Sequence, residues 1–208
     1  MTELPRTDFK KTYRQVYAAR ATPTLVDVPE LTMLAVDGVG DPEGPAYRQV
    51  VEALYGVAYT LRFGLKNAGV LEYPVMPLEG LWWSPGLRDG STADRSAWHY
   101  TMMIMQPPQV TADLVADAVA GAGRKRPSAA LDRVELRTLA EGPSAQILHV
   151  GPFSEEPATL DRLMAFIGER GLRMHGKHHE IYLSDHRRTA PEKLRTILRY
   201  PVLPPVGG

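Results

Sequence analysis

Periodic hydrophobic positions divide the chain into short strands and amphipathic helices. Residues 31–39 form an apolar run that ends in a glycine-rich turn, as is typical of a buried strand. Apolar residues then recur every three to four positions over 50–65, which predicts a long amphipathic helix that ends near Asn67. Two further apolar runs, 73–84 and 96–106, predict a pair of strands joined by a loop rich in Gly, Asp and Ser.

The second half of the chain repeats this order of elements. A strand is predicted at 145–150, a helix at 157–170, and two more strands at 179–184 and 194–200. A glycine-containing turn follows the first strand in each half. Internal duplication explains the pattern, so we expect two strand-helix-strand-strand units that join as one antiparallel sheet about a pseudo-twofold axis.

Less regular segments flank and connect the two units. Residues 1–29 are polar and lean basic, and we expect a lead-in segment that packs on the main body, with 24–28 extended. A helix is predicted at 111–123, whereas 134–139 fits either a strand or an extension of that helix. Residues 203–208 are expected to form a flexible tail.

Composition is that of an ordinary globular protein and excludes several kinds of chemistry. Of the 208 residues, 44% are hydrophobic and 23% are charged, and the 24 Lys and Arg balance the 24 Asp and Glu. A net charge of +0 provides no general attraction to phosphate, so we expect no nucleic-acid partner. The count of 0 cysteines excludes disulfides, Cys-ligated zinc and thiol catalysis.

The sequence gives no sign of a membrane or secretory route. One of the longer apolar runs is interrupted by Asp113 and Asp117, and none approaches the roughly 20 residues that a spanning helix needs. The charged N-terminus lacks the apolar core of a signal peptide. We therefore expect a cytoplasmic protein with no membrane partner.

Common cofactor and catalytic motifs are absent from the sequence. There is no GxGxxG or GxxxxGK[ST] phosphate loop and no GxSxG nucleophile turn. His175, His178 and His179 have spacings that metal ligands can show, but they lie at a turn that enters a strand, and no HExxH motif is present. We therefore expect neither a metal nor another cofactor.

The strand at 179–184 supplies a candidate site. Alternate side chains of a strand share a face, so Ile181 and Leu183 lie on one face and Glu180 and Tyr182 on the other. If the apolar pair packs on the helices, a carboxylate and a phenol lie together on the open face. An ordinary solvent-facing strand produces the same alternation, so the pattern alone does not establish a site.

Large side chains of the first unit favour a ligand-binding face. Trp82 and Trp83 point to opposite sides of their strand, so one of them lies on the open face. On the next strand Tyr100 and Met103 also point to opposite sides, so the open face carries an aromatic ring or a methionine in either case. An aromatic cleft around one carboxylate, here Glu180, suits flat ligands and attracts cationic ones.

Several distinctive motifs follow one another from Phe9 to Val202. They include Val-Asp-Gly-Val-Gly-Asp-Pro at 36–42, Leu-Glu-Gly-Leu-Trp-Trp at 78–83, Gly-Lys-His-His-Glu-Ile-Tyr-Leu-Ser-Asp at 176–185 and Leu-Arg-Tyr-Pro-Val at 198–202. This ordered set resembles the stand-alone GyrI-like proteins. The resemblance implies a domain over 30–202 with two SHS2 modules, at about 30–107 and about 143–202 in this sequence.

The resemblance also implies a fold and an activity. The expected fold is α+β, with two pseudo-twofold-related β-α-β-β modules that form one antiparallel sheet, helices on one face and a ligand cleft on the other. Relatives in transcription activators bind bulky, often cationic aromatic drugs around a central acidic residue. The sequence shows no helix-turn-helix module beside the repeats, so we expect a role like that of the stand-alone branch. Members of that branch hydrolyse cyclopropanoid alkylating natural products of the duocarmycin type.

Carried over by position, the resemblance implies that Glu180 is a general base that activates water, with Tyr182 holding the ligand or the water. A further donor must stabilise the negative charge that develops as the ring opens, and Tyr55, Tyr59 or Tyr100 could provide it.

Three functions stay open at this point. The first is the hydrolase, with Trp82 or Trp83 clamping a hydrophobic aromatic ligand. The second is a non-catalytic protein that sequesters or senses such compounds. The third is a gyrase modulator, which the neutral charge disfavours. The expected state is a monomer or a weak homodimer.

Overall fold

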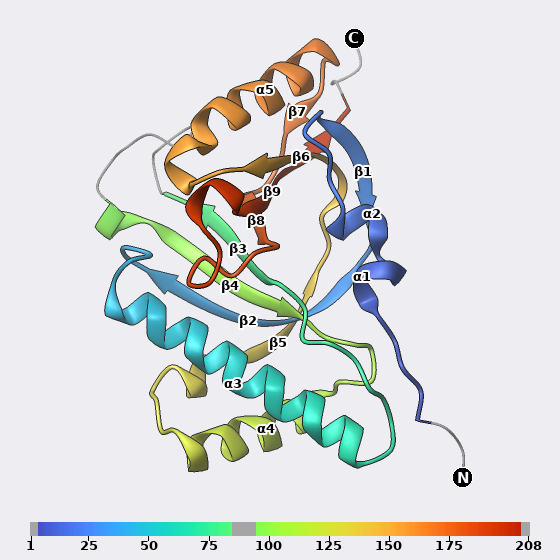
Figure 1. Ribbon diagram of the computed structural model, residues 1–208, viewed down its shortest axis with the longest axis vertical. Coiled ribbons are helices and arrows are strands. Elements are labelled where there is room, and N and C mark those ends of the chain that lie inside the picture. Colours follow the sequence, from blue (N-terminus) through green and yellow to red (C-terminus); the bar gives the residue numbers. More distant parts are fainter. Residues whose placement is uncertain (1–3, 85–94, 205–208) are drawn as a thin grey trace.

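Strands from both halves of the chain pair into one antiparallel sheet in the computed structural model, which describes residues 4–84 and 95–204. The first half contributes β2 (Leu31–Val39), β3 (Leu78–Trp83) and β4 (His99–Met105). The second half contributes β6 (Gly142–Val150), β8 (His178–Tyr182) and β9 (Arg195–Leu203). Their order is β6-β9-β8-β3-β4-β2, so the halves meet at β8 and β3 (Figure 1). Corresponding strands lie at equal distances from this junction, as the pseudo-twofold arrangement predicts.

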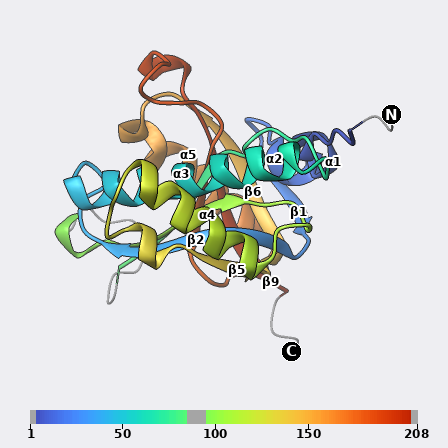
Figure 2. The ribbon, with the colours of Figure 1, turned by 90° about the horizontal axis from the view of Figure 1, so that it is seen from below.

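One crossover helix connects the first two strands in each half. The helix of the first half is α3 (Pro45–Asn67), and that of the second half is α5 (Glu156–Glu169). Helix α3 begins at a proline, which is tolerated at the first helical position, and it buries the apolar stripe that the periodicity predicts. A third helix, α4 (Ala112–Lys125), packs along α3 (Figure 2). The pair α3–α4 and the helix α5 lie at opposite ends of the sheet, with β8 and β3 between them (Figure 1).

The flanking segments belong to the same body. The lead-in segment forms two short helices, and its strand pairs with β6 at the edge of the sheet. Residues 134–139, which the pattern left open between strand and helix, contain a strand that pairs with β2. The remaining elements are α1 (Phe9–Thr12), α2 (Arg14–Tyr17), β1 (Thr24–Val28), η1 (Arg95–Ala97), η2 (Leu131–Arg133), β5 (Glu135–Leu139), η3 (Phe153–Glu155), β7 (Arg173–Met174) and η4 (Pro191–Lys193).

Parts of two expected segments lie outside the described residues. These are most of the loop between β3 and β4 and the last four residues of the expected tail. Strand β9 reaches Leu203, so the final strand is longer than the hydrophobic pattern indicated. Within the ranges 4–84 and 95–204, no helix is both long and apolar enough to cross a bilayer.

Strand register assigns side chains to the two faces of the sheet. Gly80 pairs with Glu180, and Trp82 pairs with both His178 and Tyr100, so these side chains share a face. Helix α5 packs on that face, against a cluster that includes Ile147 and Leu198 from β6 and β9. We call it the helix face.

The opposite face is buried as well. Ile181 is fully buried there, in one hydrophobic cluster with Phe9 and Val16 of the lead-in segment. The expectation that the Glu180 face points away from the helices is therefore wrong. The reason is that the curled sheet and the lead-in segment provide a second apolar environment, which Ile181 occupies instead of packing on the helices.

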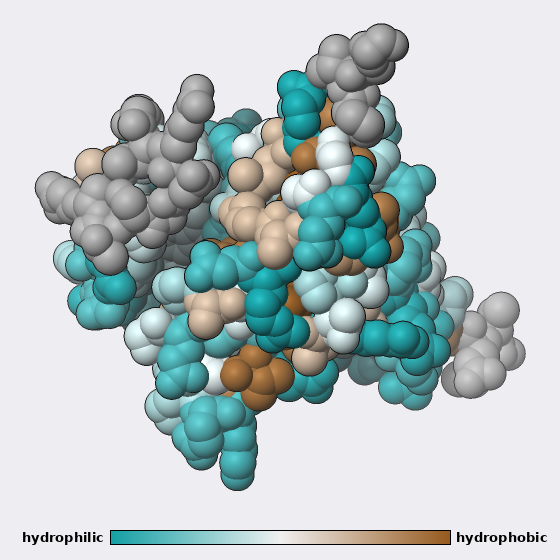
Figure 3. Space-filling view, turned by 90° about the horizontal axis from the view of Figure 1, so that it is seen from above, coloured by the Kyte–Doolittle hydropathy of each residue, from teal (hydrophilic) through white to brown (hydrophobic). Residues whose placement is uncertain are grey.

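The surface seen from above carries mostly polar residues. In Figure 3 hydrophobic residues form small patches that polar residues separate from one another. Scattered apolar residues of this kind are ordinary on a folded protein.

The close packing of β2 against β4 generates a prediction about stability. A Cβ added at Gly38 would lie 2.2 Å from ring carbons of Tyr100, whereas one added at Gly64 in α3 would meet nothing within 4 Å. Gly38→Ala should lower the free energy of unfolding by about 1–3 kcal/mol because it overpacks a core position. Gly64→Ala should leave it unchanged or raise it by up to about 1 kcal/mol. Urea unfolding of both variants checks this, and equal effects would contradict it.

Candidate functional site

The Glu180 carboxylate is fixed by its neighbours on the same face of β8. Its Oε2 accepts a hydrogen bond from the Tyr182 hydroxyl at 2.7 Å, and its Oε1 accepts one from His178 Nε2 at 3.1 Å. The three residues alternate along the strand, which brings their side chains to one face. The side chain of Glu180 is 15% exposed, so the carboxylate is oriented yet still reaches the surface.

Gly80, opposite Glu180 on β3, leaves room for the indole of Trp82. A Cβ at Gly80 would lie 2.7 Å from Trp82 Nε1. Trp82 Nε1 donates to the Tyr182 hydroxyl at 3.0 Å, and Tyr182 in turn donates to Glu180. The Leu-Glu-Gly-Leu-Trp-Trp motif therefore builds a chain of donors that ends on the carboxylate.

Aromatic rings from several elements surround this chain of hydrogen bonds. Tyr47 of α3 stacks on Trp82 with ring centroids 5.9 Å apart, and it meets Tyr100 edge-on at 5.3 Å. Trp98 packs edge-on against Trp82 at 6.0 Å, and Phe153, just before α5, packs edge-on against Tyr182 at 6.0 Å. We define the Glu180 cluster as these six rings together with three further residues, namely His178, Glu180 and Glu156.

Glu156 is the second carboxyl group of the Glu180 cluster. It is the first residue of α5, it is 8% exposed, and its Oε1 is buried with no hydrogen-bond partner among the described residues. Burial, and then the charge of Glu180, raise the pKa of Glu156 to about 9. A carboxyl group of this kind holds a proton at neutral pH.

The phenols of the cluster also keep their protons. Burial, and then the charge of Glu180, raise the pKa values of Tyr47 and Tyr182 above the ordinary range of tyrosine. The cluster thus combines an oriented carboxylate, a protonated carboxyl group and phenol donors beside flat apolar rings. This combination is able to bind an aromatic molecule and to move a proton.

Comparison with known proteins identifies the family of this chain. A family model for the GyrI-like small molecule binding domain matches residues 21–203. The chain belongs to the GyrI-like family. A comparison with curated proteins found no match.

Solved structures of GyrI-like type include two closely similar proteins from Listeria innocua. One, described as an uncharacterized conserved protein, is 43% identical with a TM-score of 0.88, over 94% of this chain and 99% of that one. The other, described as a hydrolase, is 41% identical with a TM-score of 0.84, over 94% of this chain and 99% of that one. The C-terminal domain of EcmrR, 9% identical with a TM-score of 0.57 over 88% of this chain and 98% of that one, shares the fold alone.

The GyrI-like fold brings some of the predicted site residues together and separates others. Tyr182 contacts Glu180 directly, Trp82 contacts Tyr182, and Tyr100 contacts Trp82. Trp83 and Met103 lie on the opposite face because each is one residue out of phase with the helix-face positions. Trp83 instead lies under the ammonium of Lys177, which is 3.2 Å from its ring centroid, and Met103 is buried.

The two predicted tyrosines of α3, Tyr55 and Tyr59, stack on one another but lie in different surroundings. Each four-residue step turns the row by about 40° around the helix, so the row spirals away from the sheet. Tyr55 stays close to the cluster, since it interacts electrostatically with Tyr47 and with Asp185 in the loop after β8. Tyr59 is 47% exposed and, with Phe63, lines a groove of about 880 Å³ between α3 and α4 instead.

Five members of the cluster, one of which is Trp98, were not among the site residues predicted from the sequence. His178 could have been found, because it alternates with Glu180 and Tyr182 in the same strand. No feature of the sequence indicated that Glu156 is buried in the cluster, since an acidic residue in the first turn of a helix ordinarily complements the helix dipole at the surface. Tyr47 and Phe153 lie outside the periodic stretches that defined the helices.

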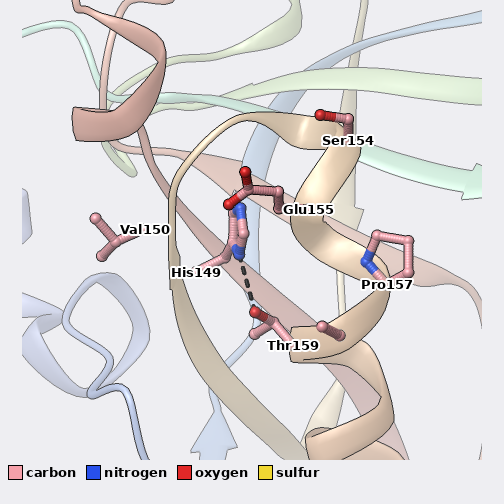
Figure 4. A pocket seen from close by; sticks show the side chains of 7 residues that line it. His149, Val150, Ser154, Glu155, Pro157 and Thr159 are labelled. Carbon is pink, nitrogen blue, oxygen red and sulfur yellow. Dashed lines mark hydrogen bonds between the residues drawn. The ribbon is translucent and has the colours of Figure 1, made fainter.

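The histidines serve separate purposes in the GyrI-like fold. His178 and His179 point to opposite faces of β8, and among residues 4–84 and 95–204 no group of three or more His, Asp or Glu could hold a metal ion. His149 borders a cavity of about 460 Å³ at the start of α5, where its Nε2 donates to the Pro152 carbonyl at 3.1 Å. Its Nδ1 therefore accepts from the Thr159 hydroxyl at 2.9 Å (Figure 4). With both nitrogens engaged, His149 holds α5 to β6.

A second polar network lies directly behind Glu180, on the opposite face. His179 is fully buried, with Nε2 3.0 Å from Glu79 and Nδ1 3.0 Å from Glu141. Glu79 accepts a hydrogen bond from Tyr17 of α2 at 2.8 Å, and Glu141 accepts one from Arg199 at 3.1 Å. The network thus ties the lead-in segment to the strand that carries Glu180.

The network also shifts the pKa values of its members. Burial opposes a charge on His179, but Glu141 and then Glu79 outweigh it and raise the pKa of His179 to about 9. Burial likewise opposes a charge on Glu141, but His179 and then Arg199 lower the pKa of Glu141 to about 2.

These shifts predict how stability depends on pH. The raised pKa of His179 adds to the free energy of unfolding. This stabilisation is complete below the ordinary histidine pKa of about 6.5 and is lost as the pH rises through about 9. The difference in unfolding free energy between the wild type and His179→Gln should therefore shrink over this window. Urea unfolding across the window measures it, with exposed His175→Gln as the control. A constant difference would contradict a charged His179.

Proposed function

We propose that this GyrI-like protein binds bulky hydrophobic aromatic molecules, including cationic ones, at the Glu180 cluster and hydrolyses cyclopropanoid alkylating compounds there. One observation carries the proposal: an oriented carboxylate, fixed by Tyr182 and His178, lies beside stacked aromatic rings. The relative that is 41% identical and is described as a hydrolase supports the reaction type. The compound class rests on the motif resemblance of the sequence.

The aromatic rings supply the binding energy in this proposal. Offset stacking contributes about 0.5–1.5 kcal/mol per ring pair beyond the burial of apolar area. A cationic ligand is attracted to ring faces and to the Glu180 charge as well. Trp82 and Tyr47 are the first candidates, because they already stack on one another next to the carboxylate.

The proposed reaction adds one water to the substrate. Glu180 takes a proton from water while the water oxygen forms a bond to the methylene carbon of the cyclopropane ring. The ring carbon–carbon bond breaks, and its electron pair moves through the conjugated dienone to the carbonyl oxygen, which then takes up a proton to become a phenol. Ring strain drives the opening, so the protein supplies positioning, a base and donors to the oxygen.

The donors to that oxygen are assigned to Tyr47 and Tyr55. Burial raises the pKa of both, so each keeps its hydroxyl proton at neutral pH. Tyr59 faces the groove between α3 and α4, and the ring of Tyr100 packs with its hydroxyl against Gly38. In this proposal Tyr100 therefore serves as a wall and Tyr59 takes no part.

A non-catalytic binder is the second candidate. Both oxygens of Glu180 already accept a hydrogen bond, which suits a fixed counter-charge for a cation. Each carboxylate oxygen retains a further lone pair, however, so the base role is not blocked.

Glu180→Gln separates the two candidates. The variant should lose hydrolysis of a spirocyclopropane dienone by about a hundred- to ten-thousand-fold, because it lacks the base. It should still quench tryptophan fluorescence on binding. Product mass, which rises by one water on hydrolysis, provides the measurement, and exposed Glu169→Gln is the control. Full turnover by Glu180→Gln would contradict the base assignment, and binding without turnover by the wild type would favour the binder.

The two adjacent tryptophans provide a matched test of the binding site. Trp82→Ala should weaken binding of an aromatic probe such as acridine by about 1–3 kcal/mol, as loss of a stacking ring does elsewhere. Trp83→Ala should leave the affinity unchanged, because Trp83 lies on the opposite face. Calorimetric titration of both variants measures this. An equal loss in both would place the ligand elsewhere.

A further inference from the structure

Two carboxyl groups from different elements lie close enough to interact electrostatically. Glu180 comes from β8, and Glu156 comes from the first turn of α5, three residues after Phe153, which contacts Tyr182. Acidic residues in a first turn are ordinarily solvated. Glu156 is instead more than nine-tenths buried, and its Oε1 has no donor among the described residues.

The surroundings of the two carboxyl groups differ. Glu180 accepts hydrogen bonds from Tyr182 and His178. Glu156 is buried beside the negative charge of Glu180, and both conditions favour its neutral form. The pair thus carries one proton near neutral pH, and Glu156 holds it.

We propose that Glu156 is a proton reservoir that adjusts the charge of the site to the charge of the ligand. It stays protonated beside a neutral aromatic ligand and releases its proton to the solvent when an aromatic cation binds. The inference rests on the proposed binding function and extends it, because it assigns both neutral and singly cationic aromatics to one site.

The physical basis is the effect of a nearby cation on a carboxyl group. A positive charge within about 4–6 Å lowers a carboxyl pKa by about 1–3 units. For Glu156, whose pKa is about 9 without ligand, this moves the titration to near neutral pH. Proton release should therefore be largest at about pH 8 and smaller on either side.

Proton release by Glu156 must be distinguished from proton release by other titratable groups near the cluster. The titratable groups that face or border the cluster are His178 and Tyr182 on β8, Tyr47 and Tyr55 on α3, Asp185 and His186 in the loop after β8, and His149 and Glu155 near the start of α5. His179 titrates in the same pH range, since its pKa is about 9, but it lies behind β8, on the opposite face between Glu79 and Glu141. A variant at Glu156 itself then isolates its contribution.

The experiment uses one ring system in two charge states. Acridine is neutral at about pH 8, whereas N-methylacridinium carries a permanent positive charge. Calorimetric titration of the full-length protein in phosphate and in Tris, which differ in ionisation enthalpy, gives the protons released per ligand bound. The variants are Glu156→Gln and, as the matched control on the same turn, exposed Glu155→Gln.

For a pKa shift of about 2 units, the wild type and Glu155→Gln should release about 0.8 proton at pH 8 with N-methylacridinium and none with acridine. Glu156→Gln should release none with either, and should bind the cation about ten-fold more weakly while binding acridine unchanged. Unchanged acridine binding also shows that the variant is folded. Cation binding without proton release, or with release that persists in Glu156→Gln, overturns the inference and leaves the proposed function standing. Failure of the wild type to bind either ring contradicts both.

Discussion

The antiparallel pairing of β3 with β8 joins the two halves of the sheet and sets the position of every polar group near its centre. A shift of one residue in this register would exchange the two faces. The pairing of Gly80 with Glu180 is therefore decisive, because it places the one position without a side chain opposite the carboxylate. Trp82 occupies the space that Gly80 leaves and donates to Tyr182. The neighbouring residue His179 is directed to the other face by the same alternation.

The two faces deal with buried charge in opposite ways. On the face away from the helices, His179 lies between two carboxylates, and Arg199 lies beside one of them, so charges are paired where they are desolvated. On the helix face, Glu156 is desolvated, and its Oε1 has no hydrogen-bond partner within 4–84 and 95–204. An unpaired buried carboxyl group costs stability unless it is neutral. The His179 network therefore holds the strand and the lead-in segment in place, whereas the helix face holds a buried carboxyl group that can titrate.

Much of this architecture is predictable from the sequence, but the choice of face is not. The strands at 24–28 and 31–39 follow from local patterns, and the pairing of Glu180 with Tyr182 on one face follows from alternation alone. Alternation does not say which face the helices cover. Ile181 is apolar and fits equally well under a helix or inside a curled sheet, and only long-range packing decides between them. Glu156 escapes prediction for the same reason, since its burial depends on a strand that follows it in the chain by more than twenty residues.

The mutual packing of the aromatic rings determines what a ligand has to do at the Glu180 cluster. Tyr47, Trp82, Tyr100 and Trp98 contact one another with centroids 5.3–6.0 Å apart, so a ligand that enters between them must replace an existing ring contact. Their backbones belong to α3, β3, β4 and the segment that enters β4, and the two strands are held by the sheet. Adaptation must therefore come from side-chain rotation. Stacking lost between two protein rings is regained between a ring and the ligand, and this exchange depends on the flatness of the ligand more than on its outline. Under the proposed function such a site discriminates weakly by shape, so the charge of Glu180 and the protonation state of Glu156 become the main source of its selectivity.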